Sequence, residues 1–139
     1  MRYEQIELMG IFTSFTHDTD FKLILKHGLS IYNKQVNTLE KLALKLNIPL
    51  PSRPALPVTS PIDPETITDR FMYRIILNLQ LTSLDAHVRA IIETIKNEAL
   101  RKLWTEFLNI EIEDYDKYLK YGKLKDWTRI VPIYAEPVT

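Results

Sequence analysis

The chain has 139 residues, of which 45% are hydrophobic and 26% are charged. This composition is typical of one folded domain and excludes a disordered or collagen-like chain. Basic and acidic residues each number 18, so the chain lacks the basic excess with which nucleic-acid-binding proteins neutralise phosphates. It contains no cysteine, which excludes disulfides and thiolate chemistry. We therefore expect a single domain over residues 1–139, with no nucleic-acid partner and no membrane span.

The first part of the chain predicts two helices, over residues 3–15 and 18–46. Asp18 or Thr19, in the interruption between them, is a suitable N-cap for the second helix. Apolar residues of this second segment recur at steps of three and four, which is typical of one buried helical stripe. The expected inner positions are Ile6, Met9 and Phe12 or Phe15 in the first helix, and Phe21, Leu25, Gly28, Tyr32, Val36, Leu39, Ala43 and Leu46 in the second.

A proline-rich segment follows the second helix. Six of the 8 prolines lie between Pro49 and Pro64. Each proline fixes φ, lacks an N–H and disfavours the helical conformation of the residue before it. We therefore predict an extended crossover over residues 48–63.

The third predicted helix covers residues 64–95. Asp63 is a suitable cap, and Pro64 suits the first helical position. The segment has no charge between Ile75 and Leu84, so we expect it to be the most buried helix, and the amides of Asn78 and Gln80 to need partners there. Its expected inner positions are Phe71, Ile75, Leu81, Leu84, Val88, Ile91 and Ile95.

The fourth predicted helix covers residues 98–121, between a capping Asn97 and a terminating Gly122. An extended tail is expected over residues 123–139. Four helices joined by two short turns and one long crossover are typical of an all-α, ferritin-like four-helix bundle. The expected inner positions of the fourth helix are Leu100, Leu103, Trp104, Phe107, Leu108, Ile110, Tyr115 and Tyr118.

Three segments carry a family resemblance. They are the helix exit Asn47-Ile-Pro-Leu-Pro, the segment Asp69-Arg-Phe-Met-Tyr-Arg, and the closing Trp127-Thr-Arg-Ile-Val-Pro-Ile-Tyr. Together they resemble a ferritin-like domain of unknown function from spore-forming bacteria, some of whose members are called spore coat proteins. Asn47 stands where a glycine is usual, and asparagine tolerates the left-handed conformation required there. The resemblance implies a helical bundle and a coat-associated role, and no established activity.

A ferritin-like bundle raises the question of a di-iron site, which requires Glu-x-x-His on two helices. Neither the motif nor its ligand set occurs, so we predict no catalytic residue, no metal and no cofactor. The three histidines are His17, His27 and His87, and the residues three places before them are Ser14, Ile24 and Leu84.

A reduced metal site remains an alternative interpretation, with Glu7, His87, Glu111 and Asp114 as ligands. The competing interpretation places Glu111 and Asp114 on a solvated helix flank. On that interpretation His87 is a hydrogen-bonded or half-exposed histidine, His17 helps a cap, and Gly28 permits close helix packing.

We therefore predict a non-catalytic structural or interaction protein of the spore coat, located in the cytoplasm or the coat. Its expected partners are other coat proteins or a second copy, because the resembled family often carries this unit twice in one chain. The alternatives are a metal-dependent enzyme with a degenerate carboxylate and histidine site, or a small-molecule carrier with an interhelical pocket. The pocket would use the aromatic residues Tyr32, Tyr73, Trp104, Tyr115, Tyr118 and Tyr121.

Overall fold

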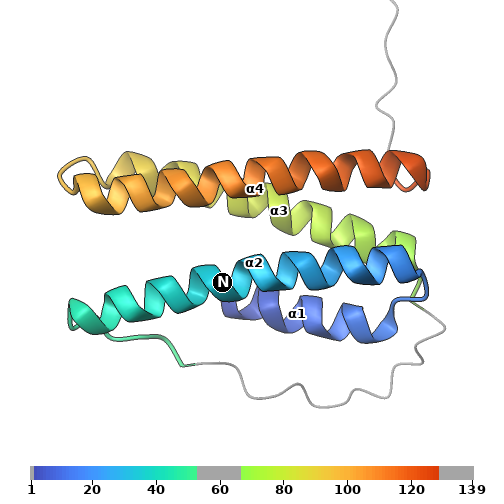
Figure 1. Ribbon diagram of the computed structural model, residues 1–139, viewed down its shortest axis with the longest axis horizontal. Helices are drawn as coiled ribbons and strands as arrows, with labels where there is room; N and C mark the ends of the chain where they lie inside the picture. The colour runs from blue at the N-terminus through green and yellow to red at the C-terminus, as the bar shows by residue number, and fades with distance from the viewer. Residues whose placement is uncertain (1, 53–66, 129–139) are drawn as a thin grey trace, which may run out of the picture.

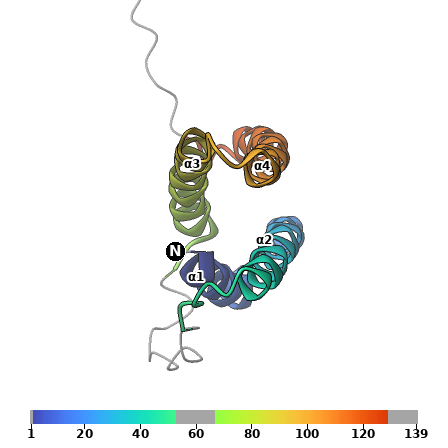
Figure 2. The same ribbon diagram turned by 90° about the vertical axis from the view of Figure 1, so that its left-hand side faces the viewer.

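The computed structural model describes residues 2–52 and 67–128, which form two helical hairpins (Figure 1). The first hairpin consists of α1 (Arg2–Phe15) and α2 (Thr19–Lys45), and the second of α3 (Asp69–Glu93) and α4 (Glu98–Leu124). Viewed along the helices, the four ribbons occupy the corners of a bundle, with α3 beside α1 and α4 facing α2 (Figure 2). No strand occurs in these two ranges, which confirms the all-α helical bundle. The ferritin-like assignment stays a prediction.

Polar side chains cap α2 and α4, as their sequences suggest. Asp18 Oδ1 accepts a hydrogen bond from Phe21 N (2.9 Å), and Asn97 Oδ1 accepts one from Leu100 N (3.0 Å). Both caps were predicted, because an N-cap depends only on residues three positions apart.

The start of α3 was predicted wrongly. The helix begins at Asp69 and not at residue 64, and its N-cap is Thr68, whose Oγ1 accepts from Phe71 N (3.1 Å). The two carboxylate oxygens of Asp69 accept hydrogen bonds from His17 N (3.0 Å) and Asp18 N (2.7 Å). These bonds anchor the first turn of α3 to the α1–α2 turn. The expected start signal at residues 63–65, and residues 53–63 of the predicted crossover, lie outside the described residues.

Two helix ends also differ from the predictions. α3 ends at Glu93, before the expected 95, and α4 continues through Gly122 to Leu124, so residues 123 and 124 are helical and not part of a tail. Gly122 is buried against Tyr73, where an added Cβ would overlap the phenol ring. The left-handed residue after α4 is instead Asp126 (φ 58°). Of the predicted tail beyond it, residues 129–139 lie outside the described residues.

The other left-handed position is Asn47 (φ 55°), just after α2, as expected from its place in the helix exit. The preceding helix is held there by hydrogen bonds from Asn47 N to Leu44 O and from Ile48 N to Ala43 O. Gly28, in the middle of α2, permits close packing as predicted, because a Cβ at this position would lie 2.8 Å from Met9 Cε.

An aromatic cluster fills one end of the bundle, where α3 starts and α4 ends. The rings of Tyr73 and Tyr118 stack with their centroids 4.4 Å apart, and each hydroxyl donates to the main-chain carbonyl of the other residue at 2.9 Å. Phe21 from α2 packs against both rings, and Trp127 meets Phe21 edge-on at 5.2 Å. Tyr73 and Tyr118, two of the aromatic residues predicted to form a pocket, therefore belong to the core.

The inner face of α3 differs most from the prediction. Of the expected inner residues, Phe71, Leu81, Val88 and Ile95 are exposed, and Asn78 is exposed as well. The helix is therefore not the most buried of the four. Polar side chains replace apolar ones along its inner line, which consists of Met72, Tyr73, Ile76, Gln80, Ser83 and His87.

Smaller corrections concern α2 and α4. Leu46, expected at the end of the α2 stripe, is exposed, and so is Ile110 on α4. The buried positions of α4 include Glu111, which the preferred interpretation placed on a solvated flank.

Candidate functional site

A buried polar cluster occupies the middle of the bundle, away from the aromatic end. Its members come from three helices: Arg2 and Gln5 at the start of α1, Ser83 and His87 in α3, and Glu111 in α4. All but Arg2 are buried residues. Arg2 lies in the first turn of α1, and its side chain reaches Ser83 in α3 and Glu111 in α4 of the second hairpin. We call these five residues the Arg2–Glu111 network.

Arg2 is the hub of the network. Its Nη2 lies 2.8 Å from Glu111 Oε1 and donates to Ser83 Oγ at 3.0 Å, while Nη1 donates to Gln5 Oε1 at 2.7 Å. The guanidinium also stacks over the ring of Tyr32 at 4.1 Å from its centroid. Ion pairing, hydrogen bonding and a cation–π contact therefore all fix the same charged group.

Both ring nitrogens of His87 have defined roles. Nδ1 lies 2.7 Å from Ser83 O, an acceptor, and Nε2 lies 3.4 Å from Arg2 Nη2, a donor. Because a carbonyl oxygen can only accept, Nδ1 carries a proton in this contact. Nδ1 also lies 2.9 Å from Glu111 Oε2, but its N–H points to the Ser83 carbonyl, so the contact with Glu111 is polar and not an aligned hydrogen bond.

The charge state of Glu111 follows from these contacts. Burial raises the pKa of Glu111, but the polar contact with His87 and the charge of Arg2 more than offset it, so the pKa lies below its ordinary value. Ser83 supports the carboxylate further, because its hydroxyl donates to Oε1 at 2.9 Å. Glu111 is therefore an ionised, paired carboxylate at neutral pH.

A small cavity adjoins the network on the side of α2. It has a volume of about 10 Å³, close to that of one water molecule, and is lined by Tyr32, Gln80, Leu84, Glu111 and Asp114. Gln80 Nε2 donates to Asp114 Oδ2 at 3.3 Å. Burial raises the pKa of Asp114 and raises that of Tyr32 to about 12. This cavity is too small for a metabolite, which does not favour the carrier interpretation here.

Two of the four residues of the alternative metal site come together in the structure. His87 and Glu111 are in contact, and Asp114 lies one turn along α4 at the cavity. Glu7 makes no hydrogen bond or ion pair with them within the described ranges, and Arg2 already supplies the cation beside Glu111. Among residues 2–52 and 67–128, no group of three or more Asp, Glu, His or Cys side chains is arranged to hold a metal ion.

The other two histidines do not join the cluster. His27 is exposed, with Nε2 3.9 Å from Asp114 Oδ1. At His17 the main-chain N–H, and not the side chain, donates to Asp69 Oδ1, so the expected capping role of this histidine stays a prediction.

Arg2, Gln5 and Ser83 are the members of the network that the sequence interpretation missed. A signal for the α3 part exists: Gln80, Ser83 and His87 lie at i, i+3 and i+7, which places them on one helical face. No local pattern indicates that Arg2 meets this face, because the contact joins residues more than 80 positions apart.

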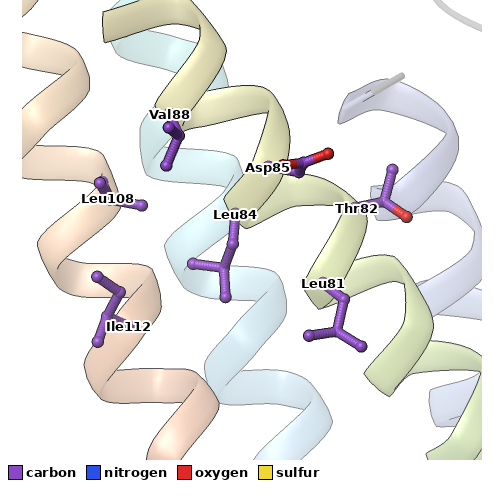
Figure 3. A pocket seen from close by; sticks show the side chains of 7 residues that line it. All are labelled: Leu81, Thr82, Leu84, Asp85, Val88, Leu108 and Ile112. Atoms are coloured by element: carbon purple, nitrogen blue, oxygen red, sulfur yellow. The ribbon is translucent and has the colours of Figure 1, made fainter.

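A second feature is an open groove of about 570 Å³ between α3 and α4 (Figure 3). Its floor is apolar, with Leu84, Leu108 and Ile112 lying between the two ribbons, and α2 lies behind it (Figure 3). Asp85 and Thr82 are its polar lining residues. The groove thus faces away from the first hairpin. No helix within the described ranges has the length and apolar character of a membrane-crossing segment.

Comparison with known proteins agrees with the fold. A crystal structure of a "putative spore coat protein" from Bacillus halodurans superimposes with a TM-score of 0.85 at 20% sequence identity, covering 97% of this chain and 87% of that one. None of the curated proteins compared with the chain matches it. The model of one family, described as a protein of unknown function (DUF3231), matches residues 3–138. The chain therefore belongs to the family of proteins of unknown function DUF3231.

Proposed function

We propose that this protein is a non-catalytic structural or interaction protein associated with the spore coat, and that its helical bundle acts through its surface. The structural relative from Bacillus halodurans, called a "putative spore coat protein", supports the coat role. Its partners are a second copy of the chain or other coat proteins.

The observation that carries this proposal is the pairing of Glu111 with Arg2 at 2.8 Å in the centre of the bundle. A general acid or base must exchange a proton near neutral pH. The guanidinium never deprotonates, and its charge together with the His87 contact holds the pKa of Glu111 below its ordinary value despite burial. The neighbouring His87 has both nitrogens engaged. These groups therefore serve to join helices and not to transform a substrate.

The test follows a fluorescently tagged copy in sporulating cells of the source organism, with fractionation of isolated coats. We expect the protein in the coat fraction, both for the wild type and for a variant whose ion pair is replaced by apolar residues, Arg2→Met with Glu111→Leu. A diffuse wild-type signal that never concentrates at the spore would contradict the proposal.

The paired variant separates a structural role from a chemical one. If it folds but loses its coat location, the network has a role beyond joining helices. Stoichiometric iron, manganese or zinc in protein purified without chelators, lost in this variant, would favour the metal-dependent enzyme instead.

A further inference from the structure

The outer face of the α3–α4 hairpin carries apolar side chains that the bundle does not cover. On α3, Leu81, Val88 and Ile92 are 46%, 43% and 62% exposed, and on α4 Ile112 is 48% exposed. Leu81, Val88 and Ile112 line the groove between the helices (Figure 3). Contiguous exposed apolar surface of this kind marks interaction sites on soluble proteins.

The arrangement is more specific than scattered surface leucines. Leu81, Val88 and Ile92 follow one another at steps of seven and four, so they form a ridge along one side of α3. The same helix turns Gln80, Ser83 and His87 inward. α3 thus presents an apolar ridge to the outside, directly beside the groove that it forms with α4.

A ridge and a groove on the same face allow that face to pair with itself. In a two-fold pair, the ridge of one copy enters the groove of the other and the contact is repeated reciprocally. Such a face must also be self-complementary in charge. It carries Asp85 at the rim of the groove and the exposed Arg89 one turn further along α3.

Consider two α3 helices that pair in antiparallel fashion, with the two-fold axis between them at the height of residue 87 along each helix. Positions 85 and 89 lie two residues on either side of this height, so position 85 of one copy lies opposite position 89 of the other. Asp85 then faces Arg89 of the second copy twice, once on each side of the axis. Neither residue has an ion pair within the part of the chain that the structure describes. The net charge of zero adds no long-range repulsion between copies.

We propose that the α3–α4 groove docks the same face of a second copy, forming a two-fold dimer in which Leu81 and Val88 are buried and Asp85 pairs with Arg89 across the interface. This inference rests on the proposed interaction role and names its partner. An antiparallel pair of ridges also places Leu81 of one copy near Ile92 of the other, which closes the apolar strip at both ends.

Analytical ultracentrifugation of the full chain over a range of concentrations tests the surface. We expect a concentration-dependent dimer, and about a hundredfold weaker dimerisation for Val88→Glu, because a charge would be buried at the centre of the contact. Leu44→Glu is the matched control, since Leu44 is 69% exposed on α2, away from the groove, and its replacement should leave the dimer unchanged. A monomer at all concentrations, or equal effects of the two variants, would overturn the inference.

Charge reversal tests the partner. Asp85→Arg alone should weaken dimerisation about tenfold or more, because like charges then face each other. The double variant Asp85→Arg with Arg89→Asp restores opposite charges only if the same face meets itself, so it should recover the dimer. If the double variant does not recover the dimer, this pairing is excluded. A groove that binds a different protein instead of a second copy would give the same result.

These outcomes are distinguishable from failure of the proposed function. A monomeric protein that still concentrates in the coat overturns the dimer but not the coat role. A dimeric protein that remains diffuse in sporulating cells overturns the coat role but not the dimer.

Discussion

At Gly122, α4 approaches Tyr73 so closely that an added Cβ would overlap the phenol oxygen and ring carbons. The Tyr73 ring cannot easily move away, because it is fully buried and stacked on Tyr118. At Gly10, by contrast, nothing lies within 4 Å of the position of an added Cβ. The chain therefore contains two helical glycines with opposite structural requirements.

We expect Gly122→Ala to lower the free energy of unfolding by about 1–3 kcal/mol, as overpacking does. Gly10→Ala should raise it by about 0.5–1 kcal/mol, since it relieves the entropic cost of a glycine inside a helix. Urea denaturation monitored by circular dichroism measures both. Equal stability of the Gly122→Ala protein and the wild type would mean that the Tyr73 ring has room to shift.

Residues whose role depends on near neighbours were predicted correctly. Asp18 and Asn97 cap their helices, and Asn47 adopts the left-handed conformation, because each role involves residues a few positions away. Gly122 was assigned the wrong role because its role depends on a distant residue. A glycine near a helix end is typical of a helix stop, but the residue that Gly122 contacts, Tyr73, lies far away in the chain.

At the scale of the helix, α3 shows where hydrophobic periodicity misleads. A stripe drawn through its apolar residues selects Leu81 and Val88, which are exposed, and passes over Gln80, Ser83 and His87, which are buried. Periodicity locates an inner face only when that face is apolar. The bundle buries polar groups here because other helices supply their hydrogen-bonding partners.

The start of α3 was misplaced for a related reason. Asp63-Pro64-Glu65 is a stronger local start signal than Thr68-Asp69, but Asp69 also accepts two main-chain hydrogen bonds from the α1–α2 turn. A sequence pattern does not contain this tertiary contact.

Asp18 joins the start of α2 to the end of α4 at this end of the bundle. It caps α2 through Phe21 N, and it accepts hydrogen bonds from Tyr121 (3.0 Å) and Lys125 Nζ (2.7 Å) near the end of α4. The Lys125 hydrogen bond, followed by that of Phe21 N, lowers the pKa of Asp18 from 3.8 to about 2.

Because the pKa of Asp18 is lower in the folded state, its stabilising contribution is complete above the unfolded-state value of 3.8 and is lost as the pH falls through about 2. We expect the difference in unfolding free energy between the wild type and Asp18→Asn to shrink over this interval, since the amide has no charge to lose. Urea denaturation at a series of pH values measures it. A difference that is constant with pH would show that the charge of Asp18 contributes nothing to the unfolding free energy. Asp116→Asn, which removes one charge of the exposed pair Asp116–Lys120, is the control.

At the scale of the whole molecule, the four-helix architecture was predictable and the content of its centre was not. Apolar periodicity and capping signals indicate four helices and their order. They do not indicate that the first turn of α1 inserts a guanidinium between the hairpins, because that contact depends on how the two hairpins pack. The placement of Glu111 on a solvated helix flank was wrong at this point: Arg2, His87 and Glu111 meet in the centre of the bundle.

The Arg2–Glu111 pair connects the first helix to the last, so it contributes to the docking of one hairpin on the other. Glu111→Leu removes the counter-charge of a largely buried guanidinium, and we expect it to cost about 3 kcal/mol of unfolding free energy. Arg2→Met leaves the Glu111 carboxylate buried without its cation and should cost a similar amount.

Replacing both partners together should behave differently. A variant with Arg2→Met and Glu111→Leu buries apolar groups of similar size and leaves no unpaired charge, so we expect its stability to lie within about 1 kcal/mol of the wild type. The shortfall from the sum of the two single effects gives the coupling energy between the residues. Denaturant titrations of the four proteins measure it. Additive losses would mean that the ion pair itself does not join the hairpins, because each side chain would then be held by its other neighbours. These neighbours are Gln5 and Tyr32 for Arg2, and Ser83 and His87 for Glu111.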